Sequence, residues 1–118
     1  MKTPYLALAL SAAALLTAAQ EGFCQTTEKS PIDRYALYVA SNNGGPGREV
    51  LRYAGSDAEK VAQTLSEIGG VPAAKSILLI DPARSDVDLA FESIAADIAR
   101  NKGKARRSEF IFYYSGHS

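Results

Sequence analysis

The sequence predicts a small α/β domain built on a parallel sheet, and three observations support this. Short apolar segments that suit strands alternate with longer segments whose apolar residues recur every three or four positions. From residue 33 onward the order is strand, helix, strand, helix, strand, joined by short polar loops. The chain has 118 residues, 47% hydrophobic and 22% charged, which is the composition of one globular domain.

The first nineteen residues predict an export signal outside that domain. Lys2 precedes an apolar run, YLALALSAAALLTAA at 5–19, that ends in small residues. At about fifteen residues the run is short for a membrane-spanning helix, which needs roughly 20. We therefore expect an exported protein, periplasmic or secreted, with no membrane span in the mature chain. A linker is predicted over 20–32 and the domain over 33–118.

Charge and cysteine content narrow the possible partners and reactions. The 13 basic and 13 acidic residues become 12 and 13 without Lys2, a formal charge of −1, which gives no reason to expect nucleic acid as a partner. Cys24 is the only cysteine, so an internal disulfide is impossible. It lies in the polar linker, where lipid anchoring is left open and a role as nucleophile is not expected.

The first strand is predicted at Tyr35–Ala40 (YALYVA), followed by a loop, SNNGGPG, at 41–47. Ser56 and Glu59 have the spacing of a capping box and predict the start of the first helix. The apolar residues behind them fall on one helical face: Ala58, Val61, Ala62, Leu65 and Ile68. Two glycines at 69 and 70 are expected to end the helix.

The second half of the domain repeats this pattern. Ser76–Ile80 (SILLI) predicts a buried strand, and Ser85 with Asp88 predicts the start of the second helix. Its apolar stripe is Val87, Phe91, Ile94 and Ile98. After a basic link at 100–107, Phe110–Tyr114 predicts a core strand. Three strands alone would leave open edges and one poorly covered face, as in half of a larger domain.

The last strand is followed directly by Ser-Gly-His-Ser, which contains His117, the only histidine of the chain. Open α/β sheets bind ligands at the carboxyl ends of their strands. One interpretation makes Ser118 the nucleophile of a GxSxG elbow in an α/β-hydrolase-type serine hydrolase, which requires a later histidine. The other makes His117 the proton-transfer residue for a nucleophile elsewhere. One histidine and scattered carboxylates give no metal-ligand cluster.

Four segments together resemble the first half of a caspase-like cysteine peptidase domain of the bacterial and metacaspase type. They are RYALYVASNNGG at 34–45, LRYAGSDAEKVAQTLSEIGGV at 51–71, SILLIDPARSDVDLAFESIAADIA at 76–99 and FIFYYSGHS at 110–118. The most specific match is FYYSGH, and the next is the pair Asp57 and Ala58 that follows Leu51. The resemblance implies an α/β three-layer sandwich, of which this chain would carry an incomplete parallel sheet.

The same resemblance implies a cysteine-type endopeptidase that acts on proteins or peptides without a cofactor. It implies that His117 is catalytic and that the backbone N–H of Ser118, where the family has glycine, helps to bind the oxyanion. Arg52 lies where some members bind an acidic substrate side chain. The nucleophilic cysteine would lie beyond residue 118, so this chain is expected to have no turnover by itself. A non-catalytic interaction module is the remaining alternative.

Overall fold

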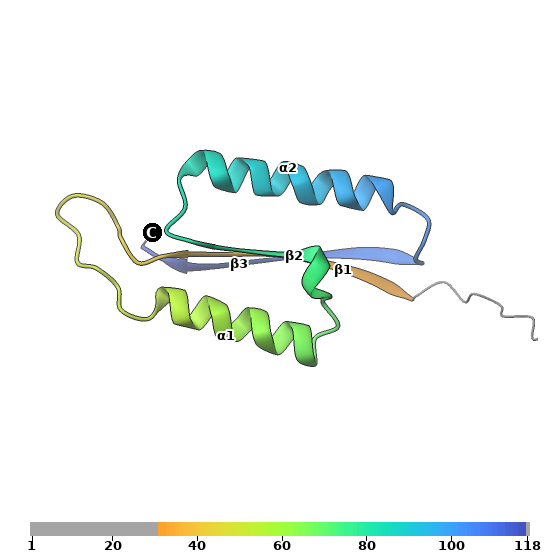
Figure 1. Cartoon of the computed structure of the whole chain (residues 1–118), viewed down its shortest axis with the longest axis horizontal. Helices are drawn as coiled ribbons and strands as arrows, with labels where there is room; N and C mark the ends of the chain where they lie inside the picture. The colour runs from red at the N-terminus through yellow and green to blue at the C-terminus, as the bar shows by residue number, and fades with distance from the viewer. Residues whose placement is uncertain (1–30, 118) are drawn as a thin grey trace, which may run out of the picture.

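The computed structural model describes residues 31–117 (Figure 1). Its elements, in chain order, are β1 (Ile32–Ser41), α1 (Ala54–Glu67), a short 3-10 helix η1 (Ala73–Lys75), β2 (Ser76–Ile80), α2 (Arg84–Arg100) and β3 (Arg107–Gly116). The predicted α/β class and the β-α-β-α-β order are confirmed. The predicted export signal at 1–19, Cys24 and Ser118 lie outside the described residues. No helix within 31–117 is long and apolar enough to cross a membrane.

The three strands are parallel and lie in the order β2-β1-β3. The chain moves from β1 to one neighbour and then crosses back over β1 to the other. Because both crossovers are right-handed by preference, this reversal sends the two helices to opposite faces of the sheet. Figure 1 shows α1 below the sheet and α2 above it. The expectation of one poorly covered face is therefore wrong.

The central strand β1 forms the middle of the core and is buried on both faces. Tyr35, Leu37 and Val39 point toward α2, where they pack against Ala90 and Ile94. The residues between them face the side of the sheet that α1 covers. Ala36 and Tyr38 pack beside Val71, which follows α1, and Ala40 packs beside Ala54 and Ala58 of α1. Small residues at this second face allow α1 to lie close to the sheet.

The predicted core strand at 110–114 is instead an edge strand, and so is the predicted buried strand at 76–80. Three alternate side chains of β3 are exposed by about half: Phe110 (41%), Phe112 (50%) and Tyr114 (46%). Phe91 of α2 packs against two of them, with ring centroids 5.9 Å from Phe110 and 5.4 Å from Phe112. The open edges that the sequence predicted are therefore present in this part of the chain.

Both helices begin before their predicted starts. Helix α1 begins at Ala54, and Ser56 is no cap, because its hydroxyl donates to the carbonyl of Tyr53 (3.1 Å). Helix α2 begins at Arg84, and the carboxylate of Asp86 accepts the backbone N–H of Ala83 (3.0 Å). The predicted core residue Ile68 is 83% exposed, because α1 ends at Glu67. The other apolar residues of the predicted helical faces pack toward the sheet.

Candidate active site

The strand order reverses at β1, and this reversal marks the place where a site is expected. In a doubly wound sheet, crossovers that leave neighbouring strands in opposite directions open a crevice beyond their carboxyl ends. Here those strands are β1 and β3, which run in register up to Ser41 beside Gly116. The long loop at 42–53 follows β1, and His117 follows β3 at the same edge of the sheet (Figure 1). The only histidine therefore lies at this switch point.

The imidazole of His117 is held by main-chain atoms of that loop. Its Nε2 lies 2.7 Å from the backbone carbonyl oxygen of Glu49, which only accepts hydrogen bonds. Nε2 therefore carries the hydrogen, and in the neutral ring Nδ1 is left as the proton acceptor. On the other side of the residue, the hydroxyl of Tyr114 donates to the carbonyl of His117 (2.5 Å). The ring is thus fixed between β3 and the β1 loop.

Two glycines make this approach possible. A Cβ atom at Gly44 would lie 2.7 Å from Cγ of His117, so any side chain there would displace the ring. A Cβ atom at Gly116 would lie 2.6 Å from the hydroxyl oxygen of Tyr114 and 2.9 Å from Cβ of Ser41. Neither glycine has a positive φ, so close packing and not backbone conformation requires them. Glycine is therefore required at 44 by the imidazole and at 116 by Tyr114 and Ser41.

A polar anchor at the end of β2 holds the start of the β1 loop. Oδ1 of Asp81 accepts the backbone N–H groups of Asn42 (2.7 Å) and Asn43 (3.0 Å), and Oδ2 accepts the side-chain amide of Asn42 (3.1 Å). These bonds, first that from the backbone of Asn43, lower the pKa of Asp81. Oδ1 of Asn42 in turn accepts the N–H of Gly55 (3.1 Å) in the first turn of α1.

Asp81 directly follows the strand predicted at 76–80, and no local pattern marks it as a site residue. Its position at the carboxyl edge, after a strand and before proline, was the available signal, but its partners are almost forty positions away. Asp81 also has a φ of 49°, a region that non-glycine residues seldom occupy. Beside it lies a pocket of about 250 Å³ lined by Ser41, Asn43, Gly45, Asp81 and Pro82.

Within residues 31–117, no contact joins the other predicted site residues to the imidazole. Arg52 is exposed in the turn before α1 and forms no ion pair with another described residue. Asp57 is exposed in the first turn of α1, whereas Ala58 is buried against Ala40 of β1. Residues 31–117 contain no cysteine and no group of three or more potential metal ligands.

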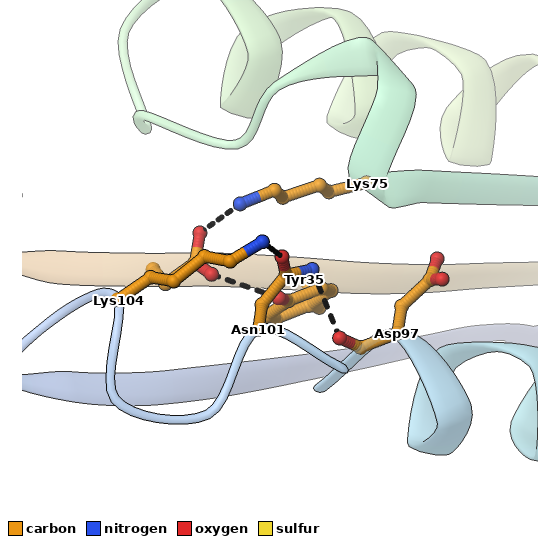
Figure 2. A network of polar contacts seen from close by, with 6 residues as sticks. Tyr35, Lys75, Asp97, Asn101 and Lys104 are labelled. Carbon is orange, nitrogen blue, oxygen red and sulfur yellow. Dashed lines mark hydrogen bonds and ion pairs between the residues drawn. The ribbon is translucent and has the colours of Figure 1, made fainter. Parts of the chain in front are cut away.

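A second polar cluster lies at the opposite, amino-terminal edge of the sheet (Figure 2). Asp33 at the start of β1 accepts hydrogen bonds from Lys75 and from the hydroxyl of Tyr35 (2.8 Å). The ammonium group of Lys75 also lies 5.1 Å from the centre of the Tyr35 ring. Lys104 donates to Asn101 just after α2 (2.7 Å). These groups satisfy one another and tie β1 to η1, so we assign this cluster a structural role.

Comparison with known proteins adds nothing to this geometry, because no family model, curated protein or solved structure matches the chain. A functional assignment must therefore come from the residues of the site and the way they are held.

Proposed function

We propose that this chain is the histidine-bearing part of a caspase-like cysteine endopeptidase, with His117 as the residue that transfers protons. One observation carries the proposal. The imidazole lies at the switch point of the sheet with Nε2 bound to the carbonyl of Glu49, so that Nδ1 is the basic atom. A histidine held in one tautomer by a main-chain oxygen is suited to general acid-base catalysis.

In the proposed reaction Nδ1 of His117 takes the proton of a cysteine thiol, and the thiolate attacks the scissile carbonyl carbon. The carbon–nitrogen bond then breaks, the imidazolium returns its proton to the leaving amine, and a thioester remains on the enzyme. Water, deprotonated by the same imidazole, hydrolyses the thioester and restores the thiol. We propose that this cysteine belongs to the parent gene product, beyond residue 118, and that the substrate is a protein or peptide.

Two further residues have proposed roles in substrate binding. The backbone N–H of Ser118 follows the histidine directly and is the candidate donor to the oxyanion. Arg52 is the candidate partner for an acidic substrate side chain, because it is exposed and forms no ion pair among residues 31–117. The proposal needs no cofactor, and residues 1–19 would direct the protein out of the cytoplasm.

Probe labelling of the complete gene product tests the proposal. A peptide probe that reacts with thiols should label the parent enzyme, and His117→Ala should reduce the labelling rate at least about 100-fold, the usual scale of general base catalysis. Gly44→Ala should also reduce it, because the new methyl group would displace the imidazole. Gly103→Ala is the control. A Cβ atom there would meet nothing within 4 Å, and the strain from its positive φ of 84° falls in the link before β3 and not in the loop that holds the imidazole.

The outcomes separate the candidate functions. A coding sequence that places Asp-x-Cys some tens of residues after position 118 supports the cysteine peptidase. A continuation of x-Gly-Gly after Ser118, with labelling by a serine-directed probe instead, would establish the α/β-hydrolase alternative. If neither probe reacts with the folded product, the domain is an interaction module and the proposal is wrong.

A further inference from the structure

We propose that Asp81 is a positioning residue for His117, acting through Asn42 and the loop that follows β1. Its catalytic meaning rests on the proposed function, but the geometry it controls can be measured without any activity. Asp81 lies on β2's side of the sheet and His117 follows β3, so the effect must pass across the end of β1.

Asn42 is the link, because all four of its polar groups are engaged. Its backbone N–H and its side-chain amide donate to Asp81 (2.7 and 3.1 Å), and its Oδ1 accepts the N–H of Gly55 (3.1 Å). Its backbone carbonyl accepts the N–H of Leu51 (2.8 Å). The last bond closes residues 42–51 into a loop, and Asp81 and the first turn of α1 anchor the base of this loop.

Both atoms that hold the imidazole belong to this closed segment. Gly44 packs against the ring, and the carbonyl of Glu49 binds Nε2. Bonds inside the segment stiffen it: Oδ1 of Asn43 accepts the N–H of Gly45 (3.0 Å), whose carbonyl accepts the N–H of Arg48 (3.2 Å). A shift of Asn42 is therefore passed to both contacts of the imidazole and is not absorbed by a slack loop.

The chemistry requires a carboxylate at position 81. An ionised carboxylate only accepts hydrogen bonds, and the three groups that face Asp81 all donate them. Asp81→Asn would set its new amide N–H against the side-chain amide of Asn42. If Asn42 turned its amide over to accept that N–H, its nitrogen would then face the N–H of Gly55. One bond is therefore lost whichever way the amide lies, while the positive φ remains acceptable for asparagine.

A pair of complementary substitutions tests this inference. In Asp81→Asn the nuclear Overhauser contact between the His117 ring and the α-protons of Gly44 should be lost, and the single imidazole should leave its Nε2–H tautomer. Asn42→Asp alone should fail in the same way, because it places two carboxylates face to face. The double variant Asn42→Asp/Asp81→Asn restores every donor–acceptor pair and should restore both signals.

Asp33→Asn is the control, because Asp33 also accepts hydrogen bonds, from Lys75 and Tyr35, but lies at the start of β1, at the opposite edge of the sheet from the histidine. It should lower the urea midpoint and leave both His117 signals unchanged. If folded Asp81→Asn keeps both His117 signals of the unsubstituted chain, or if the folded double variant lacks them, Asp81 does not position the imidazole. Because no catalysis is measured, the proposed peptidase function could fail while this result stands.

Discussion

For single side chains, the central finding is that main-chain atoms orient the one histidine. The carbonyl of Glu49 binds Nε2, and the α-carbon of Gly44 supports the ring. The side chain of Glu49 takes no part in that bond. The position of the imidazole therefore depends on the path of the loop and on the absence of a side chain at residue 44, more than on the identity of residue 49.

Tyr38 offers a prediction about an unpaired group in the core. Tyr38 is 1% exposed, and its hydroxyl has no hydrogen-bond partner among the described residues. Burial raises the pKa of this phenol. A buried polar group without a partner costs about 1–3 kcal/mol. Tyr38→Phe should therefore leave the free energy of unfolding unchanged or raise it by about 1 kcal/mol, measured by urea unfolding.

Tyr35→Phe is the matched comparison, because it removes a hydroxyl that donates to Asp33. It should lower the free energy of unfolding by about 1 kcal/mol. A loss in Tyr38→Phe as large as that in Tyr35→Phe would mean that the Tyr38 hydroxyl has a partner.

Among the secondary-structure elements, β1 carries a different polar site at each of its two ends. At its amino end, Asp33 and Tyr35 join η1 through Lys75 in a fully bonded cluster. At its carboxyl end, Asn42 and the following loop receive the imidazole. The element that forms the core also sets the distance between β2 and β3, so both ends are fixed by the same ten-residue strand.

The amino-terminal cluster predicts how stability changes with pH. The hydrogen bond from Lys75, and next that from Tyr35, holds the pKa of Asp33 below its ordinary value of 3.8. A carboxyl group whose folded pKa is lowered stabilises the protein fully above its unfolded pKa, and this contribution is lost as the pH falls through the folded value. The urea concentration at the unfolding midpoint should therefore decrease as the pH is lowered below about 4, and the decrease should be smaller in Asp33→Asn.

The fall should not vanish in Asp33→Asn, because the pKa values of Asp81 and Glu109 are lowered as well. Asp88→Asn serves as the control. Within residues 31–117 its carboxylate forms one ion pair, an exposed one with Arg84 at 3.8 Å, which contributes little. If the urea midpoint decreases with acid to the same extent in the unsubstituted chain and in Asp33→Asn, the role assigned to the cluster is wrong.

At the scale of the whole domain, residues 31–117 form a three-stranded sheet with a helix on each face and an open edge at β3. Helices cover both faces over β1, yet the outer edge of β3 and its aromatic row have no strand beside them in residues 31–117. Exposed aromatic side chains on an open strand edge favour pairing with a further strand. This agrees with the proposal that the chain is the first part of a larger sheet.

The sequence was sufficient for the order of the elements, because apolar periodicity is a local property that a single segment carries. It was also sufficient to locate His117 at a strand end. It did not distinguish the central strand from the edges, since YALYVA and FIFYY have the same apolar character and only the reversed crossover decides which is enclosed. The start of α1 was missed because the N–H of Gly55 in its first turn is capped by the side chain of Asn42, which lies 13 positions earlier in the chain. The predicted cap, Ser56, is adjacent in sequence to that N–H.

The remaining parts of the site were beyond local patterns. Any residue could supply the carbonyl that Glu49 presents, so no side-chain pattern marks it. Gly44 resembles the other glycines of its loop, and only the approach of His117 makes it indispensable. Asp81 finds its partners through the pairing of β1 with β2, which requires the folded sheet.

The most direct test is the tautomer of the only histidine, measured by long-range nitrogen–proton NMR on the whole chain near neutral pH. Nε2 bound to the Glu49 carbonyl predicts the Nε2–H form, with Nδ1 unprotonated and a contact between the ring and Gly44. A predominant Nδ1–H form, or a ring that shows no contact with Gly44, would contradict a histidine poised for proton transfer at the carboxyl edge of the sheet.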